Sequence, residues 1–427
     1  MRKIGWILPF LVFPLCMQGQ TAREEIDENP ALAGGKYYAY EAPDGQLTLA
    51  PAGYTPFYIS MFARHGSRYL TKEKKYTQPL SLLLAADEAG VLTADGKRAL
   101  KVVAALAQEA EARYGELTPK GARQHRELID RMYRHYPEVF ADGVHVDARS
   151  TYKTRAFLSM AAGCVELKGL NPKLHITTQA SEADAYYIKY KNPLYEAQHL
   201  ENSDSVYRVA DSVYVHPARL MRQLFRDSSY VEAHIQPVKL MTDLFELHGI
   251  SQSSGRQPDL SFLFTPQERY DLWQRNNFEW YYEKGASPLS DGCMYKLEKN
   301  LLKNFIETAD TVIASRKNGV TLRYGHDTNL APLAVLMGIN DLQASTADWQ
   351  RIADTYRTYR IIPMCGNVQL IFYRKKGVKE VLVKVLLNER EVKLPLPSEI
   401  APYYAWKEVR RYWKKVVESI QLPAEMK

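Results

Sequence analysis

The sequence has little cysteine, four residues in 427, and none of the cysteine or histidine spacings that hold a metal. Cys16 lies near the N-terminus, which leaves Cys164, Cys293 and Cys365 for the rest of the chain. Three scattered cysteines allow at most one disulfide, and neither Cys-x-x-Cys nor His-Glu-x-x-His occurs. We therefore predict no metal site, and we expect these cysteines to be buried as small hydrophobic side chains.

The chain also lacks clustered basic residues. Its 56 Lys and Arg against 49 Asp and Glu give a formal net charge of +7, and these residues are dispersed. A nucleic-acid partner is therefore not expected, although a mild positive charge would help to attract a small anion. Beyond the N-terminal segment, no stretch is apolar enough to predict a membrane span.

The N-terminal residues are typical of an export signal. Two basic residues precede an apolar segment, 4–15, and small or polar residues follow it. We interpret residues 1–20 as a cleaved signal peptide, and we expect export to the periplasm of a Gram-negative bacterium. The alternative is an outer-membrane lipoprotein anchored through Cys16. It is less favoured because Leu15 is not the small residue that such sites prefer before the cysteine.

Strand and helix patterns alternate in the first part of the chain. Residues 58–63 form an apolar run of strand formers, and residues 144–146 predict a second strand. Helical periodicity starts near Ala94 and again after Thr118 and Pro119, which offer an N-cap and a proline at the first helical position. This alternation predicts an α/β sheet.

Between residues 181 and 304 the pattern changes to successive amphipathic helices with hardly a strand among them. A strand-then-helix unit follows around His326, and residues 368–395 predict an antiparallel meander that turns at 375–377. We therefore expect a helical insertion that interrupts the α/β domain. The predicted divisions are a signal peptide at 1–20, an α/β domain at 21–180 and 305–427, and the insertion at 181–304.

Charged residues gather where three predicted strands end. Because open α/β sheets place their ligands outside the carboxyl ends of the strands, we expect these side chains to converge. Three arginines and two histidines together would bind phosphate, since guanidinium groups match phosphate oxygens bidentately. Gly66 removes a side chain where the backbone would approach a ligand closely. The converging residues are Arg64, His65, Arg68, Arg149, His326 and Asp327.

These motifs resemble those of the histidine phosphatase superfamily. Arg-His-Gly-Ser-Arg at 64–68 matches its RHGxR signature, and Gly-His-Asp-Thr-Asn at 325–329 matches the second signature of its acid phosphatase and phytase branch. Leu-Thr-Pro-Lys-Gly at 117–121 and the segment around Arg149 lie between them in the expected order. Within the branch, "RHGSRY" and "MCGNVQLIFYR" most resemble the multiple inositol polyphosphate phosphatases.

The resemblance implies a phosphoglycerate-mutase-like α/β fold, a mixed and mostly parallel sheet flanked by helices, with the insertion as an all-helical cap. It also implies a phosphomonoesterase that needs neither metal nor cofactor. The expected substrates are small anionic phosphate esters, with inositol polyphosphates such as phytate first among them. We expect the protein to be a monomer.

The resemblance further implies a role for each residue of the motifs. His65 would attack phosphorus and form a phosphohistidine, and Asp327 would protonate the leaving alkoxide and then help to activate water. Lys189 and Lys191, at the start of the cap, are further candidates for substrate binding. The phosphate oxygens would be held by Arg64, Arg68, Arg149 and His326.

Two other functions stay open. A sugar-phosphate or broad-specificity acid phosphatase would use the same residues on other substrates. A non-catalytic phospholigand-binding protein would keep the arginines, but it would require neither His65 nor Asp327, so the presence of both argues against it.

Overall fold

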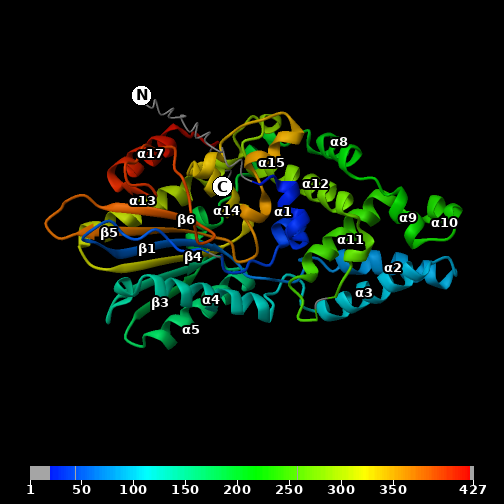
Figure 1. Ribbon diagram of the computed structural model, residues 1–427, viewed down its shortest axis with the longest axis horizontal. Coiled ribbons are helices and arrows are strands. Elements are labelled where there is room, and N and C mark those ends of the chain that lie inside the picture. The colour runs from blue at the N-terminus through cyan, green and yellow to red at the C-terminus, as the bar shows by residue number, and fades with distance from the viewer. Residues whose placement is uncertain (1–19, 44, 257, 424–427) are drawn as a thin grey trace, which may run out of the picture.

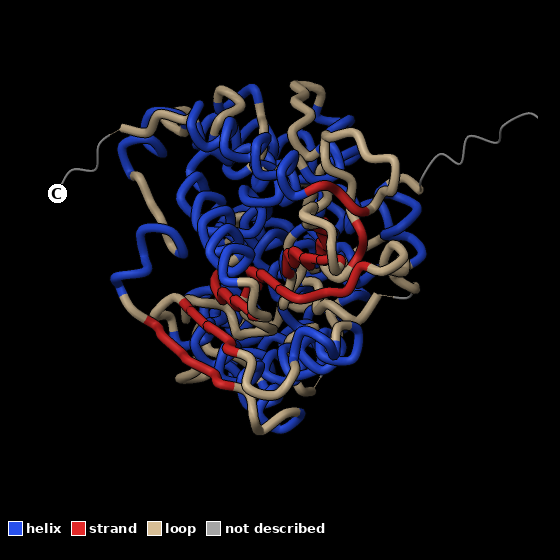
Figure 2. Tube along the Cα trace, turned by 90° about the vertical axis from the view of Figure 1, so that its left-hand side faces the viewer, coloured by secondary structure: helices blue, strands red, loops and turns tan. Residues whose placement is uncertain are grey.

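The computed structural model describes residues 20–43, 45–256 and 258–423. The predicted signal peptide up to residue 19, including Cys16, lies outside the described residues. Figure 1 shows a sheet with helices on both faces and, beside it, a larger group of helices. Figure 2, turned by 90°, shows strands through the middle of the molecule, with helices above and below them and one strand at the lower left edge.

One eight-stranded sheet forms the centre of the α/β part, in the order β3-β2-β4-β1-β5-β6-β7, with β8 beside β6. Strands β1 to β4 pair in parallel, whereas β5 to β8 make antiparallel pairs. The predicted mixed sheet flanked by helices is confirmed, but it is not mostly parallel: three strand pairs are parallel and four are antiparallel. The strands are β1 (Tyr54–Arg64), β2 (His145–Ser150), β3 (His175–Ala180), β4 (Gly319–Gly325), β5 (Asn367–Lys375), β6 (Leu382–Leu387), β7 (Arg390–Glu391) and β8 (Tyr403–Ala405).

The central strands are buried along nearly their whole length because both of their faces are covered. From Phe57 onward every residue of β1 is buried, and so is every residue of β4. Such continuous burial is typical of strands covered on both sides. The edge strand β3 was not predicted, because its sequence, His-Ile-Thr-Thr-Gln-Ala, is mostly polar and exposed.

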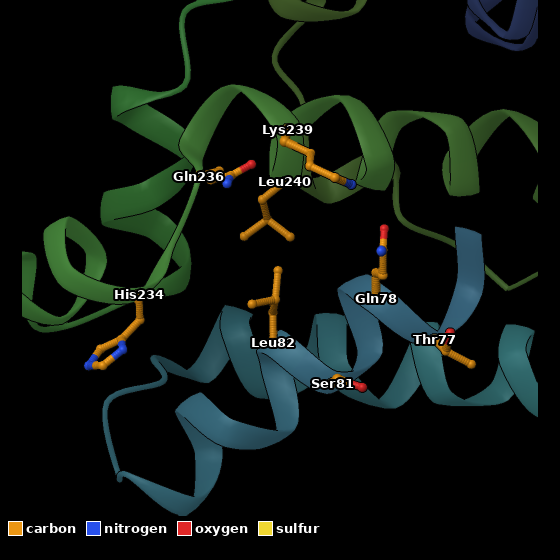
Figure 3. A pocket seen from close by; sticks show the side chains of 8 residues that line it. All are labelled: Thr77, Gln78, Ser81, Leu82, His234, Gln236, Lys239 and Leu240. Carbon is orange, nitrogen blue, oxygen red and sulfur yellow. The ribbon is translucent and has the colours of Figure 1, made fainter. Parts of the chain in front are cut away.

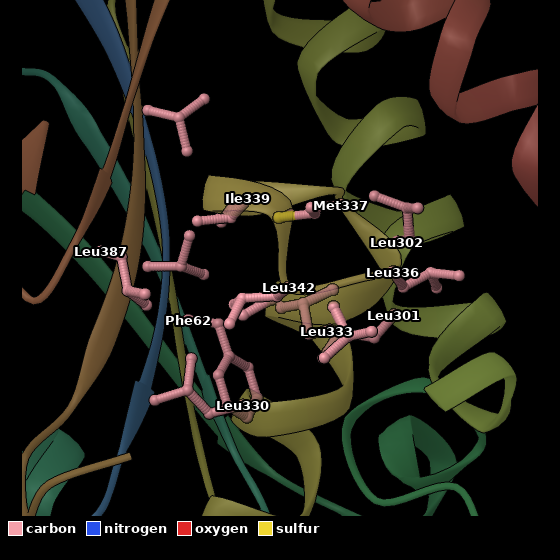
Figure 4. Packing of buried hydrophobic residues seen from close by; sticks show 14 of the residues in the cluster. Phe62, Leu301, Leu302, Leu330, Leu333, Leu336, Met337, Ile339, Leu342 and Leu387 are labelled. Atoms are coloured by element: carbon pink, nitrogen blue, oxygen red, sulfur yellow. The ribbon is translucent and has the colours of Figure 1, made fainter. Parts of the chain in front are cut away.

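Helices cover both faces of the sheet (Figure 1). On the α14 side, Phe62 of β1 packs in one apolar cluster with Leu330 and Leu333 (Figure 4). This packing fixes α14, and with it the residues that precede it, against the end of β1. One face carries α4 (Pro119–His135) and α5 (Thr154–Leu170), and the other carries α13 (Lys299–Ser315), α14 (Asp327–Leu336) and α17 (Trp406–Ser419).

The second group of helices forms its own apolar cluster. It joins the middle of the predicted helical insertion, from Val215 to Trp273, with α2 (Lys74–Glu88) and α3 (Ala94–Ala110), which pack against α9 and α11. Ile188, Ala210 and Phe278 of the insertion lie instead in the apolar cluster on the α14 side of the sheet. The insertion supplies α6 (Ala185–Ile188), α7 (Pro193–His199), α8 (Ser203–Tyr214), α9 (Ala218–Leu224), α10 (Ser228–His234), α11 (Pro237–Ser251) and α12 (Pro266–Lys284).

The predicted domain boundaries need two corrections. Residues 74–110 belong with the cap helices, because Leu83 and Val103 lie in the same buried cluster as Leu244. The predicted end of the cap at 304 falls inside α13, which packs on α17 and the sheet. An amphipathic pattern shows that a helix has an apolar face, but it does not show which layer that face contacts.

The first described residues lie between the cap and the α/β part. Helix α1 (Ala22–Glu28) and a 3-10 segment η1 (Pro30–Tyr37) precede β1, and η1 packs against α11, α12 and α16 (Thr358–Ile361). The buried Glu25 accepts a hydrogen bond of 2.6 Å from Tyr359 Oη and lies 3.2 Å from Arg357 Nη1. These contacts of Glu25 hold the N-terminal segment in place, and no sequence motif predicts them. The short helix α15 (Ile352–Thr355) lies just before α16.

The three cysteines of the described residues are buried free thiols, as expected. Cys365 has a left-handed backbone, with φ of 64°, and its N–H donates to the carbonyl of His65 at 3.0 Å. Within the part of the chain that the structure describes, no helix is both long and apolar enough to cross a membrane.

Candidate active site

The two signature motifs meet because they end neighbouring parallel strands. Arg64 at the end of β1 is the register partner of Gly325 at the end of β4. The N–H of His65 then donates to the Gly325 carbonyl at 2.9 Å. As a result the imidazole rings of His65 and His326 lie edge to face, with centroids 5.6 Å apart. The predicted convergence of these two motifs is confirmed.

Two glycines allow the loop after β1 to contact the start of α4. A Cβ on Gly66 would lie 2.3 Å from the Gly121 carbonyl oxygen, and one on Gly121 would lie 2.2 Å from the Ser67 oxygen. Thr118, the N-cap of α4, donates to that same Ser67 carbonyl through N–H at 2.9 Å and Oγ1 at 3.1 Å. Gly66 is therefore needed for contact with α4. The expectation that its close approach is to a ligand is corrected.

His65 is buried and is held in one tautomer. Its Nδ1 lies 2.9 Å from the carbonyl oxygen of Gly66, an acceptor, so Nδ1 carries the proton and Nε2 keeps its lone pair. Burial, and then the charges of Arg64 and Arg155, hold the pKa of His65 well below its ordinary value. His65 is thus a neutral imidazole with Nε2 free to act as a nucleophile.

Asp327 forms a buried ion pair with Arg64. Asp327 Oδ2 lies 2.7 Å from Arg64 Nη2, and Arg64 Nη1 donates to the carbonyls of Lys36 and Ile362 at 2.5 Å each. Burial would raise the pKa of Asp327, but Arg64 and then Arg68 outweigh it and hold the pKa well below the ordinary range. Burial also lowers the pKa of Arg64 to about 10. Asp327 is therefore a carboxylate in this structure.

Arg149 is not part of this cluster, so its predicted place in the pocket is wrong. Its Nε donates to Asp147 at 2.9 Å, its Nη1 lies 3.2 Å from Asp184, and its side chain is 30% exposed. Side chains alternate along a strand, and Arg149 shares the face of Asp147, two residues earlier. It is a structural ion-pair residue of β2.

Arg155 occupies the position that Arg149 was expected to fill. It lies in the first turn of α5, and its Nη2 is 3.4 Å from His326 Nδ1. Burial and the charge of Arg68 lower the pKa of Arg155 to about 10. The sequence did carry a signal, because Arg155 starts the helix that follows a parallel strand, which is where ligands of such sheets lie.

The three arginines present donors that the protein itself does not use. The Nε atoms of Arg64, Arg68 and Arg155 are buried and have no hydrogen-bond partner among the described residues. Unpaired buried donors cost free energy, which a bound anion would offset. His326 completes the set: Thr151 Oγ1 lies 3.1 Å from its Nε2, and burial followed by Arg155 lowers its pKa to about 3.

Lysines surround this cluster, and only one of them was predicted. Lys189 lies 4.0 Å over the Tyr152 ring and donates to its hydroxyl, and its charge contributes to the lowered pKa of His326. Lys191 is exposed, and no contact ties it to the cluster among the described residues. Lys36 was missed, although its charge helps to hold the pKa of Asp327 low.

Lys75 of α2 reaches the same region from the cap. Its Nζ donates to Glu246 Oε2 at 2.6 Å, and Tyr37 Oη donates to Glu246 Oε1 at 2.6 Å. The guanidinium of Arg68 lies 5.7 Å over the Tyr37 ring, which connects this group to the cluster. The sequence did not predict this group, because Lys75, Glu246 and Tyr37 lie on three separate elements.

A surface groove of about 440 Å³ lies elsewhere, between α2 and α11 (Figure 3). Its walls hold no arginine and one histidine, His234, and Lys239 in it is paired with Asp243. This groove therefore lacks the chemistry for phosphate transfer. Within the described residues, no group of three or more His, Cys, Asp or Glu side chains is placed to hold a metal ion.

Comparison with known proteins agrees with this geometry. The family description "Histidine phosphatase superfamily (branch 2)" matches residues 58–388, so the chain belongs to this family. Membership, together with the structural neighbours, supports phosphatase activity. A search of curated proteins found no match.

Solved structures of three phosphatases share the fold. The multiple inositol polyphosphate phosphatase of Bifidobacterium longum, in complex with phosphate, has a TM-score of 0.71 at 19% identity and covers 89% of this chain and 97% of its own. The phytase from D. castellii has a TM-score of 0.66 at 16% identity, covering 91% and 85%. Hafnia alvei phytase has a TM-score of 0.51 at 14% identity, covering 88% and 100%.

Proposed function

We propose that this protein is a metal-independent phosphomonoesterase that hydrolyses inositol polyphosphates, such as phytate, through a phosphohistidine on His65. One observation carries the proposal. A neutral imidazole with a free Nε2 lies beside Arg64, Arg68 and Arg155, each of which has a buried Nε without a hydrogen-bond partner among the described residues. Binding alone would need the arginines but not a nucleophile among them.

In the first step, His65 Nε2 attacks phosphorus, the P–N bond forms, and the P–O bond to the inositol or sugar breaks. The Gly66 carbonyl, which accepts from Nδ1, stabilises the positive charge that develops on the ring. The arginines and His326 face the phosphoryl oxygens and stabilise the charge of the transition state. Guanidinium groups supply the positive charge that a metal supplies elsewhere.

The leaving alkoxide needs a proton, and Asp327 begins as a carboxylate. A phosphate monoester has a second pKa of about 6, so its monoanion carries a proton into the site. Arg64 turns from Asp327 to the phosphate, the proton passes to Asp327, and Asp327 gives it to the alkoxide as the P–O bond breaks. Asp327 is then again a carboxylate.

In the second step, water hydrolyses the phosphohistidine. The Asp327 carboxylate takes a proton from the attacking water, the P–N bond breaks, and neutral His65 is restored. Asp327 then passes this proton to the product, which leaves as the phosphate monoanion, and Asp327 is again a carboxylate. Asp327 therefore serves as acid and base in turn, without any net change over the cycle.

The substrate class is supported by the surroundings of the cluster. Lys36 and Lys189 add positive charge around the three arginines, which suits a substrate with several phosphates. The structural neighbours named above are inositol polyphosphate phosphatases and phytases. Export to the periplasm and a monomeric state are part of the same proposal. The periplasmic location rests on the N-terminal sequence pattern.

The substrate proposal is tested by measuring kcat/KM for phytate, glucose 1-phosphate and p-nitrophenyl phosphate on one preparation. We expect phytate to be the best substrate. A tenfold or greater advantage of either other ester would replace the inositol polyphosphate proposal with a sugar-phosphate or broad-specificity phosphatase. Binding of all three without turnover would instead support a phospholigand-binding protein.

Arg155→Ala and Arg149→Ala form a matched pair that tests which arginine serves the reaction. Arg155→Ala should lower kcat by about 10²-fold or more, the effect of losing one preorganised donor to the transition state. Arg149→Ala should leave kcat within about twofold, because its ion pairs lie on the exposed face of β2. A larger loss of kcat in Arg149→Ala than in Arg155→Ala, measured by steady-state kinetics, would show that Arg149 and not Arg155 serves the reaction.

The pH profile tests the route of the proton. In the free enzyme Asp327 is already ionised and His65 is already neutral, since both pKa values lie below their ordinary ranges. Below pH 6 the substrate monoanion dominates, so kcat/KM for an alkyl phosphate should be level there. It should fall as pH rises above about 6, the second pKa of the ester. A rate that stayed level to pH 8 would show that the substrate does not deliver the proton.

A further inference from the structure

Two buried residues behind the second signature motif each have a side-chain oxygen without a hydrogen-bond partner among the described residues. Asn329, in the first turn of α14, donates through Nδ2 to Glu298 Oε1 at 3.0 Å. Glu298 ends the 3-10 segment η6 (Met294–Glu298), and the two elements pack closely. Glu298 Oε2 and Asn329 Oδ1 are both buried and have no hydrogen-bond partner among the described residues. Both are oxygens, so neither can donate to the other while Glu298 is ionised.

Among the described residues, no cation forms an ion pair with Glu298. The helices that pack against η6 are α12, α13 and α14. Of their described charged groups, Lys284 of α12 acts on Glu298, but it makes no ion pair with it and lies 3.9 Å from Glu196 instead. Lys299 of α13 donates to a backbone carbonyl, and Asp327 of α14 is paired with Arg64. A carboxylate buried without a cation is costly, and such a group takes up a proton instead.

We propose that Glu298 is a neutral carboxylic acid that forms a cyclic pair with Asn329 and so positions the turn that carries His326 and Asp327. The acid O–H on Oε2 donates to Asn329 Oδ1, while Asn329 Nδ2 donates to Oε1. Both unmatched oxygens then have partners, and two parallel hydrogen bonds hold the first turn of α14 to η6.

The structure also shows where this pair acts. Asn329 is two residues from Asp327, and its N–H lies 3.2 Å from the His326 carbonyl, so a shift of Asn329 shifts both. Burial raises the pKa of Glu298 to about 8. Glu298 therefore stays protonated through neutral pH and loses its proton in mildly alkaline solution. It is a positioning residue that acts only below about pH 8. Its effect on rate rests on the proposed function, but its protonation does not.

Glu298→Gln tests the protonation directly, because a glutamine amide donates where the acid O–H donates and cannot ionise. In the wild type the unfolded chain releases the proton near pH 4.5, while the folded chain keeps it up to about pH 8. The contribution of Glu298 to stability is therefore complete below pH 4.5 and lost as pH rises towards 8. We expect the Tm of Glu298→Gln minus that of the wild type to increase steadily from pH 5 to pH 8 and then to level off. A difference that is constant over this range would overturn the proposal.

Activity provides the second readout. The ratio of wild-type to Glu298→Gln kcat cancels any ionisation of the substrate, and it should be level below pH 7 and fall above pH 8. Below pH 7, Glu298→Ala should lower kcat on the order of tenfold with less change in KM, as expected when a supporting hydrogen bond is lost. The deficit should shrink above pH 8, where the wild type itself loses the acid proton. A level kcat ratio up to pH 9 would remove the positioning role. Inactivity of all variants and wild type, with the predicted Tm trend, would instead contradict the proposed function alone.

Discussion

His65→Ala should abolish turnover of every substrate, with kcat reduced on the order of 10⁵-fold, as when a covalent nucleophile is removed. The reason is that no other described group near phosphorus is a neutral imidazole with a free nitrogen: His326 has its Nε2 beside Thr151 and its Nδ1 beside Arg155. The measurement is steady-state release of phosphate from phytate and from p-nitrophenyl phosphate.

The variant must still fold and bind. Arg64, Arg68 and Arg155 remain, so tungstate should raise the Tm of His65→Ala as it raises that of the wild type. His145→Ala, at an exposed histidine on β2, is the matched control and should keep full activity. Substantial turnover by a folded His65→Ala would contradict a nucleophilic role for this residue.

Asp327→Asn should harm substrates in proportion to the basicity of their leaving groups. General acids contribute about 10²–10⁴-fold, so the loss on phytate should lie in that range. The loss on p-nitrophenyl phosphate should be much smaller, because nitrophenolate leaves with little help. Asn keeps the shape of Asp327 but releases Arg64 from its ion pair, so binding of the phosphate dianion should not weaken.

The comparison should be made on the burst phase, because Asp327 also assists the water in the second step. His326→Ala is the contrasting variant. It removes a contact to the transferred phosphoryl group, and so it should slow both substrates alike. If Asp327→Asn also slowed both bursts equally, Asp327 would have a phosphate-positioning role, and the proton donor would have to be sought among the cap residues.

The core of the site could be predicted because it follows directly from strand order. The motifs around His65 and His326 end two strands with apolar runs, and parallel strands place their carboxyl ends at one edge. The sequence thus located Arg64, Arg68 and Asp327 as well, since each lies within three residues of one of these histidines.

Arg149 shows where sequence reasoning fails. The prediction correctly placed Arg149 near the end of a strand. It gave the strand as residues 144–146, however, whereas β2 spans His145–Ser150, so Arg149 was expected after the strand and not on one of its faces. Arg155 is six residues further on, and the turn between the strand and α5 decides that it, and not Arg149, lies beside His326.

Other parts of the site could not be predicted because they depend on packing between distant segments. Lys36 supplies a carbonyl to Arg64 because the N-terminal segment packs against α11, α12 and α16, and Glu25 also binds Tyr359. Glu298 reads in the sequence as one more surface acid, and only its burial beneath α14 shows otherwise. Charge patterns along a chain carry no information on such contacts.

The central claim is that phosphate passes through His65, and trapping that intermediate tests it most directly. Labelled substrate would be mixed with enzyme, quenched within milliseconds, and mapped by peptide under alkaline conditions in which phosphohistidine survives. We predict one labelled site, His65, in an amount equal to the burst of leaving group, with no label in His65→Ala. A burst without label on the protein, or a label on any other residue, would contradict the account.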